Sequence, residues 1–214
     1  MLNSTASPHN NLRQITSYVL KEWQEVCCYI AGGNCHEFKG SKKEAKVLSC
    51  LTSRISKNYP QICLDSNVRF GDWFIDIVCC YKSIELAIEG KFKLQSDGAV
   101  PDNRKEAFFD LHKLEKYSKH ENNRGGVFLW LTDQPHYLKE ATGDSKDFSS
   151  HHGRNLIAGQ PLVARRFRRK NFPNPLILGQ SYSLDWKPVG ETNRWSTLIV
   201  EIGTGNQSKK DQIA

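Results

Sequence analysis

The sequence lacks long hydrophobic runs. None of its apolar stretches approaches the roughly 20 residues that a helix needs to cross a bilayer. The N-terminal stretch 1–11 is polar and has neither the basic nor the apolar region of a secretory signal peptide. Internal repeats and low-complexity segments are also missing. These absences predict a cytoplasmic protein without a membrane partner.

A disulfide framework has little support either. The cysteines number seven, an odd count, and no Cys-x-x-Cys pair occurs among them. Two adjacent pairs fall inside a helix-like and a strand-like pattern, which favours reduced and buried thiols. A zinc site built from Cys27, Cys35 and His36 is an alternative, although tetrahedral zinc sites usually show tighter ligand spacing.

What the sequence does contain is typical of a basic globular protein. A chain of 214 residues can bury one substantial core, and its 38% hydrophobic and 25% charged residues argue against wholesale disorder. The net charge of +7 makes a polyanion a natural partner. We expect a flexible N-terminus at 1–9, a single domain at 10–203 and a flexible tail at 204–214. Within the domain, a core at about 41–132 precedes a loop-rich and β extension at about 133–203.

Hydrophobic periodicity predicts the secondary structure of this domain. Apolar residues spaced by three and four predict helices over 10–30, 41–59 and 104–120. Pro101-Asp102 would be the turn before the third helix, and Gly125-Gly126 would end it. Apolar and β-branched runs predict strands over 61–69, twice within 70–95, and over 127–132, 181–189 and 195–202, the last two as an edge hairpin. The strand–helix–strand order indicates an α/β architecture.

Charged residues interrupt the two strands predicted within 70–95. Asp76 lies in the first, and Glu89 and Lys91 lie two apart in the second, so Glu89 and Lys91 project from one face. A hairpin would bring Asp76 within reach of both. Two carboxylates suit Mg²⁺, and a nearby lysine suits water activation and charge stabilisation at a phosphate. The alternative is a solvent-facing surface on which Glu89 pairs with Lys91 or Lys93.

The stretch Asp76-Ile-Val followed by Ile88-Glu89-Gly90-Lys91 resembles the PD-(D/E)XK nuclease superfamily, over roughly residues 41–132. The resemblance implies a restriction-endonuclease-like core, a mixed central sheet flanked by helices in α-β-β-β-α-β order. It implies Asp76 and Glu89 as ligands of Mg²⁺, with Mn²⁺ as a substitute, and Lys91 as the catalytic lysine.

This sequence departs from that pattern at two positions. Ile75 precedes Asp76 where proline is common, and Gly90 stands where an apolar residue is usual. A glycine inside a strand marks a bulge or a close backbone approach, so Lys93 is an alternate for Lys91. Asp72 is an alternate for Asp76 because strand parity places both on one face, although Asp72 stands at the mouth of the strand.

A fourth acidic residue matches the glutamate that the family often carries on the preceding helix. Glu44 lies three and four residues before Val47 and Leu48, so it shares the core-facing side of its helix. It would then assist catalysis. The alternative is structural, because Ser41-x-x-Glu44 is also a capping box, in which the glutamate only bonds the backbone N–H of Ser41.

Two basic segments are candidates for nucleic-acid contact. The densest has five cations around an aromatic residue, a composition that suits phosphate neutralisation and stacking: Arg165, Arg166, Arg168, Arg169 and Lys170. A solvated loop is the alternative. On the third helix, Lys113, Lys116 and Lys119 mix with acids such as Asp110 and Glu115, which favours a solvated helix face with i,i+4 pairs.

The sequence thus predicts a Mg²⁺-dependent endodeoxyribonuclease that hydrolyses phosphodiester bonds in double-stranded DNA, of a restriction, defence or mobile-element type. A compact nuclease that cuts both strands usually dimerises, so the resemblance also implies a homodimer. The alternative is a non-catalytic member of the same fold that binds nucleic acid or a protein.

Overall fold

A computed structural model describes residues 7–98, 100–164 and 172–203 of the chain. Within them, three α-helices surround a mixed six-stranded sheet: α1 (Pro8–Ala31), α2 (Lys43–Asn58) and α3 (Val100–His120). Short 3₁₀ helices are η1 (Asn34–Phe38), η2 (Pro135–Leu138) and η3 (Gly143–Phe148). The basic run predicted to contact nucleic acid, residues 165–170, lies outside the described ranges.

The sheet has the strand order β1-β2-β3-β4-β10-β9. Its strands are β1 (Cys63–Phe70), β2 (Trp73–Tyr81), β3 (Ile84–Lys93), β4 (Arg124–Thr132), β9 (Lys187–Val189) and β10 (Trp195–Ile202). Neighbours are antiparallel except β3 and β4, which are parallel and joined through α3. Parallel neighbours need such a crossover, so the predicted α/β architecture is confirmed.

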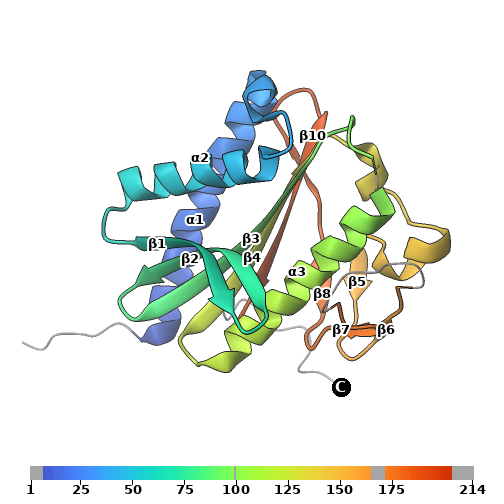
Figure 1. The fold of residues 1–214 in the computed structure, drawn as a ribbon. Coiled ribbons are helices and arrows are strands. Elements are labelled where there is room, and N and C mark those ends of the chain that lie inside the picture. The colour runs from blue at the N-terminus through green and yellow to red at the C-terminus, as the bar shows by residue number, and fades with distance from the viewer. Residues whose placement is uncertain (1–6, 99, 165–171, 204–214) are drawn as a thin grey trace, which may run out of the picture.

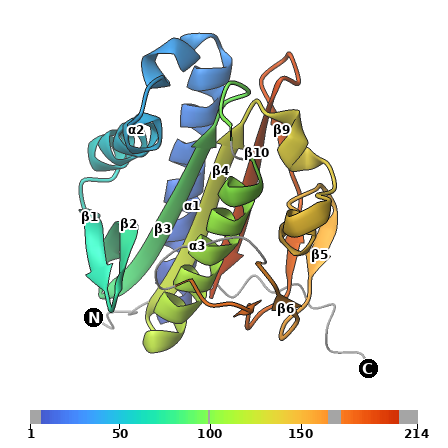
Figure 2. The same ribbon diagram turned by 45° about the vertical axis from the view of Figure 1, so that its right-hand side comes forward.

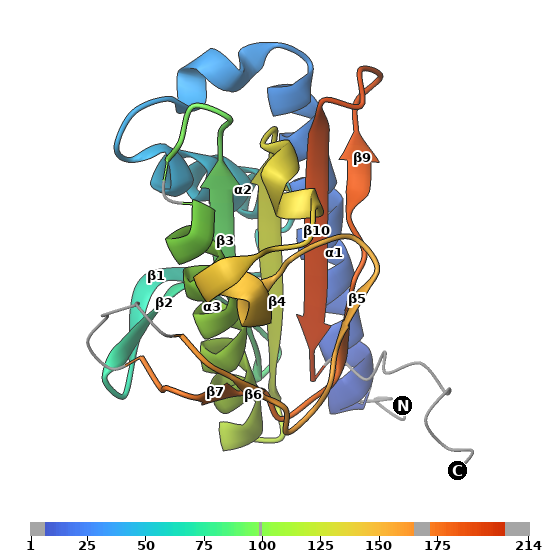
Figure 3. The ribbon, with the colours of Figure 1, turned by 90° about the vertical axis from the view of Figure 1, so that its right-hand side faces the viewer.

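The helices form layers on the two faces of the sheet (Figures 1 and 2). One hydrophobic core joins α1 and α2 to the first face through residues such as Trp23 and Phe92. A second core joins α3 to the other face through Phe108 and Trp130. Figure 3 shows α3 in front of the sheet and α1 behind it. Among the described helices, none is long and apolar enough to span a bilayer.

The chain after β4 packs over α3 and carries two small sheets. β5 (Arg154–Leu156) pairs with β8 (Tyr182–Leu184), and β6 (Pro161–Leu162) pairs with β7 (Leu176–Ile177). The strand predicted over 181–189 is therefore two strands, β8 in a small sheet and β9 in the main one. The predicted edge hairpin is formed by β9 and β10, with β9 outermost.

Two predicted boundaries of α3 and β4 were wrong. Pro101 lies in the first turn of α3, where its missing N–H is not needed, so the helix begins four residues earlier than predicted. Gly125 and Gly126 lie inside β4 and do not form a break before it. A Cβ at Gly125 would come within 2.9 Å of Leu12, and one at Gly126 within 3.1 Å of Leu114. The glycines therefore let α1 and α3 approach β4 from its two faces.

The expected solvated face of α3 was also wrong in part. Lys116 and Lys119 are exposed, but Asp110, Lys113 and Glu115 are buried. The Glu115 carboxylate accepts hydrogen bonds from the N–H groups of 179 and 180, at 2.7 and 2.9 Å, and from the Tyr182 hydroxyl at 2.7 Å. The chain after β4 covers this side of the helix, which the periodicity of α3 alone does not reveal.

All seven cysteines lie in the described residues, and each is a free thiol. Cys27 and Cys79 are buried, whereas Cys28 and Cys63 are exposed, so burial holds for only part of the set. Cys27 lies in the core, while His36 is exposed on η1. The zinc alternative therefore gains no support from this arrangement.

Candidate active site

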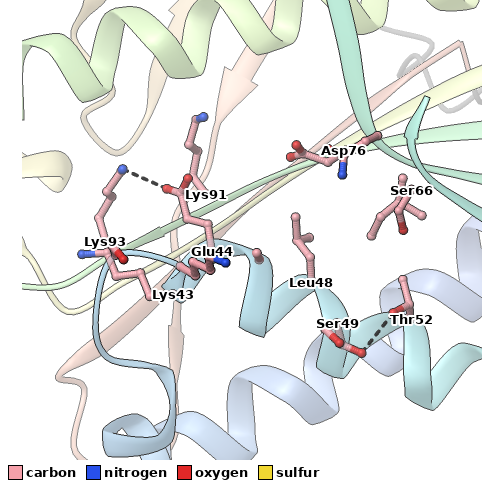
Figure 4. Close-up of a pocket in the computed structure, with 14 residues that line it drawn as sticks. Lys43, Glu44, Leu48, Ser49, Thr52, Ser66, Asp76, Lys91 and Lys93 are labelled. Atoms are coloured by element: carbon pink, nitrogen blue, oxygen red, sulfur yellow. Dashed lines mark hydrogen bonds and ion pairs between the residues drawn. The ribbon is translucent and has the colours of Figure 1, made fainter. Parts of the chain in front are cut away.

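A cleft of about 510 Å³ lies between α2 and the strands β1 to β3. Its walls are largely polar, and Figure 4 shows side chains from both sides directed toward it. The charged residues of the lining are Lys42, Lys43, Glu44, Asp76, Lys91 and Lys93. Four of the predicted site residues and alternates thus line one cleft, and Glu89 lies behind them.

The cleft reaches the middle of the sheet because β2 and β3 separate. Their backbone pairing ends at Ile77 and Ile88. Beyond that point the Asp76 carboxylate replaces the missing strand partner, since its Oδ2 accepts the Gly90 N–H at 3.0 Å. This bond places Asp76, half-buried, at the opening between the two strands.

The same edge of β3 continues as a row of amides bonded to carboxylates. Alternate N–H groups of a strand point to one side. After Gly90, the Phe92 N–H donates to Glu44 Oε1 at 3.3 Å, and the Leu94 N–H donates to Asp97 Oδ2 at 2.7 Å. Acidic side chains from β2, from α2 and from the turn after β3 thus occupy the positions that a neighbouring strand would fill.

Glu44 faces this edge and does not form the predicted alternative, a capping box. The residue at the N-terminal cap of α2 is Lys42, and no side-chain cap bond is formed there. Glu44 Oε1 instead lies 2.8 Å from Lys93 Nζ, besides its bond to β3 (Figure 4). The structural alternative was therefore wrong, and the core-facing placement of Glu44 is confirmed.

Glu89 and Lys91 lie on the same face of β3, as predicted from strand parity. That face is covered by α3, so the alternative of a solvent-facing strand was wrong. Lys91 Nζ lies 2.6 Å from Asp110 Oδ2, and Lys113 Nζ lies 2.6 Å from Glu89 Oε1 and 2.9 Å from Asp110 Oδ1. The four side chains form one alternating chain of charges between β3 and α3.

Burial and neighbouring acids change the electrostatics of the two predicted metal ligands. Burial raises the pKa of Asp76, the Gly90 N–H opposes the rise, and the charge of Asp110 adds to it. Burial also raises the pKa of Glu89 well above its usual value, and the charges of Asp110 and Asp76 raise it further. The three carboxyl groups therefore lie within electrostatic range of one another in a buried site.

The lysines of this network are held as cations. Burial alone lowers the pKa of Lys91, but the charges of Asp110, Glu44 and Glu89 outweigh it and hold that pKa above its ordinary value. The pKa of Lys113 is raised in the same way, since Asp110 and Glu89 outweigh the effect of burial. Both amines remain protonated at neutral pH.

Asp110 and Lys113 are the site residues that the sequence reasoning missed. Along α3, Asp110, Lys113 and Tyr117 form a stripe spaced by three and four. The stripe faces one side of β3. Tyr117 bonds Glu85 at 2.6 Å, Lys113 pairs with Glu89, and Asp110 pairs with Lys91. The sequence signal for this contact is a stripe on α3 whose charges complement those of one face of β3.

The alternates fall in different places. Asp72 is exposed in the turn between β1 and β2, where it lines a separate hollow with Arg69 and Trp73. Lys93 lines the main cleft and pairs with Glu44. Of Lys91 and Lys93, it is Lys91 that joins the buried network with Glu89, and the register of β3 against β4 runs without a bulge from Glu85 to Lys93.

The glycine between Glu89 and Lys91 marks a close approach of α2. A Cβ on Gly90 would lie 2.6 Å from Leu48 Cδ2, so Gly90→Ala forces the leucine or the helix to move. We expect a loss of about 1–3 kcal/mol in the free energy of unfolding, measured by chemical denaturation. Gly98→Ala is the matched control, because nothing lies within 4 Å of its Cβ position.

A second variant tests the cause of that loss. If the steric contact is responsible, Gly90→Ala combined with Leu48→Ala costs less than the sum of the two single substitutions. Strict additivity would contradict the close approach.

Comparisons with family models, with curated proteins and with solved structures find no match to this chain. Among the described residues, no group of three or more His, Cys, Asp or Glu side chains is placed so that it could hold a metal ion.

Proposed function

We propose that the chain is a Mg²⁺-dependent endonuclease of the PD-(D/E)XK type that hydrolyses phosphodiester bonds in double-stranded DNA. One observation carries the proposal: where β2 and β3 separate, Asp76 bonds the Gly90 N–H, next to Glu89 and Lys91 of the buried charge network. The order α2, β1, β2, β3, α3, β4 supports the restriction-endonuclease-like fold that the resemblance implies.

Asp76 and Glu89 would hold the metal ion. Mg²⁺ takes oxygen ligands and keeps several waters or phosphate oxygens, so two carboxylates are a sufficient protein contribution. Burial raises the pKa of both carboxyls and the charge of Asp110 raises it further, and a bound divalent cation would favour the charged form of both. When bound, the metal would supply Lewis-acid polarisation of the phosphate and an activated water.

Lys91 would act as a cation and not as a base. An ammonium held in the charged form by Asp110 donates hydrogen bonds but has no lone pair to accept a proton. Its role would be to orient the attacking water and to stabilise the negative charge that develops on the phosphate. Glu44 would assist from α2 by neutralising Lys93 at the mouth of the cleft.

DNA is the substrate that the charge of the chain supports best. The net charge of +7 and the lysines of the cleft suit a polyanion. Residues Arg165 to Lys170 remain the proposed contact to the duplex. A homodimer, with one subunit for each strand, follows by analogy with other compact nucleases.

Plasmid cleavage tests the proposal. Wild type is expected to convert supercoiled DNA to nicked and linear forms with Mg²⁺ or Mn²⁺, and not with a chelator. Asp76→Asn is expected to lower the rate by about a hundredfold or more, because it removes a charged metal ligand and keeps the side-chain shape. Asp72→Asn, four residues away in the exposed turn, is the control and should cleave like wild type. Equal cleavage by wild type and Asp76→Asn contradicts the assignment.

The second candidate is a non-catalytic protein of the same fold that binds nucleic acid or another protein. It is favoured by the pairing of Glu89 with Lys113 and of Lys91 with Asp110, which satisfies the charges without a metal. Binding of duplex DNA without cleavage, in Mg²⁺ and in Mn²⁺, would support this candidate over the nuclease.

A further inference from the structure

Lys113 is a buried cation surrounded by three oxygen atoms. Its Nζ lies 2.6 Å from Glu89 Oε1 and 2.9 Å from Asp110 Oδ1, and it donates to the Phe74 carbonyl oxygen at 3.1 Å. An ammonium has three N–H groups, so each can be directed at one of these oxygens. Lys113 and Glu89 are only 5% and 1% exposed.

Lys113 pairs with Glu89, the carboxylate that would also bind the metal. Asp76 and Lys91 line the open cleft, whereas Glu89 lies behind them and holds the Lys113 ammonium. A divalent cation that binds both Asp76 and Glu89 would therefore approach a site at which a positive charge is already present. The two cations repel each other, and this repulsion weakens metal binding.

We propose that Lys113 is an internal counter-ion that competes with the divalent cation for Glu89 and thereby sets the metal affinity of the site. The inference rests on the proposed function. When a metal binds, the Lys113 ammonium gives up its contact with Glu89 and keeps Asp110 and the Phe74 carbonyl as acceptors. Lys113 is a positioning residue in this scheme, because it acts through Glu89 and touches neither metal nor substrate.

Lys91 does not have this role, although it carries the same charge nearby. Its ammonium pairs with Asp110 Oδ2, on the other oxygen of the carboxylate that Lys113 contacts. Removal of Lys91 thus leaves the contact between Lys113 and Glu89 in place. Substitution of Lys91 and substitution of Lys113 are therefore expected to have different effects on metal binding, and this difference separates their roles.

Metal binding without DNA tests the inference. Binding of Mn²⁺ to the full chain is measured by titration calorimetry for wild type, Lys113→Met and Lys116→Met. Lys113→Met is expected to bind Mn²⁺ more tightly by about tenfold or more, because it removes the competing charge at Glu89. Lys116→Met removes the same charge from an exposed position one turn further along α3 and should bind like wild type.

The outcomes separate this inference from the proposed function. If wild type binds Mn²⁺, Glu89→Gln loses that binding and Lys113→Met does not tighten it, the counter-ion role is wrong and the metal site stands. If wild type binds no Mn²⁺, or Glu89→Gln binds like wild type, the metal site and the counter-ion role are both wrong.

A second variant covers the case in which Lys113→Met does not fold. Lys113→Gln is also neutral and can still donate to the Phe74 carbonyl, so the same tightening is expected. If both variants are unfolded without metal, recovery of the helical circular dichroism signal on addition of Mn²⁺ supports the inference. Absence of recovery overturns it.

Discussion

Lys91→Met is expected to slow cleavage of duplex DNA by about a hundredfold to a thousandfold, the cost of removing one preorganised donor from a developing anion. Lys91 is the lysine of the buried network with Asp110 and Glu89, whereas Lys93 pairs with Glu44 at the mouth of the cleft. Lys93→Met should therefore keep most of the activity. Single-turnover rates with saturating Mg²⁺ measure both effects without interference from product release.

The pair of variants also decides which lysine is catalytic. Both substitutions remove one charge from β3, so a general loss of basic character affects them equally. A rate loss confined to Lys93→Met would show that the catalytic lysine is Lys93. Thermal melts of the two variants establish whether a loss of rate comes from the loss of the folded state.

Asp110→Ala should have the largest effect on stability, about 3–5 kcal/mol, because it leaves the buried ammonium groups of Lys91 and Lys113 without their shared acceptor. Asp102→Ala is the control, since Asp102 also pairs with a lysine three residues later on α3 but has a side chain that is 57% exposed. Because water reaches the Asp102 carboxylate, its pairing with Lys105 is screened and contributes roughly 0–1 kcal/mol. Urea denaturation of both variants measures the difference.

The stabilisation that Asp110 contributes depends on pH with a definite sign. Burial alone would raise the pKa of Asp110, but Lys91 and Lys113 outweigh it and hold the pKa below its ordinary value. In the unfolded chain, an aspartate titrates at about pH 4. The stabilisation is therefore fully present above that pH and is lost as the pH falls through the lower pKa of the folded state. A gap between wild type and Asp110→Ala that widens in acid would contradict this account.

The parts of the site that depend on local geometry were predictable from the sequence. Strand parity places Glu89 and Lys91 on one face of β3, and helix periodicity turns Glu44 toward the sheet. Both follow from spacings within one element. The cleft depends in addition on the hairpin of β2 and β3, which brings Asp76 to the edge of β3.

The rest depends on how distant segments pack. Asp110 and Lys113 meet β3 only because α3 crosses back over the sheet, and α3 is buried only because the chain after β4 covers it. Mixed charges on a helix have the same spacing whether water or a strand faces them. Gly125 and Gly126 are ambiguous for a similar reason, since close packing and a chain break both favour glycine.

The carboxylates along β3 have a consequence for self-association of the protein. A strand edge with unsatisfied N–H groups can pair with another chain, and native proteins block such edges. Asp76 and Glu44 accept hydrogen bonds from the N–H groups of Gly90 and Phe92, so they block the part of β3 that β2 leaves unpaired. Alanine at either position removes an acceptor and is expected to promote aggregation through this edge. Asparagine and glutamine retain a carbonyl oxygen for the amide, so they remove the charge while keeping the edge closed.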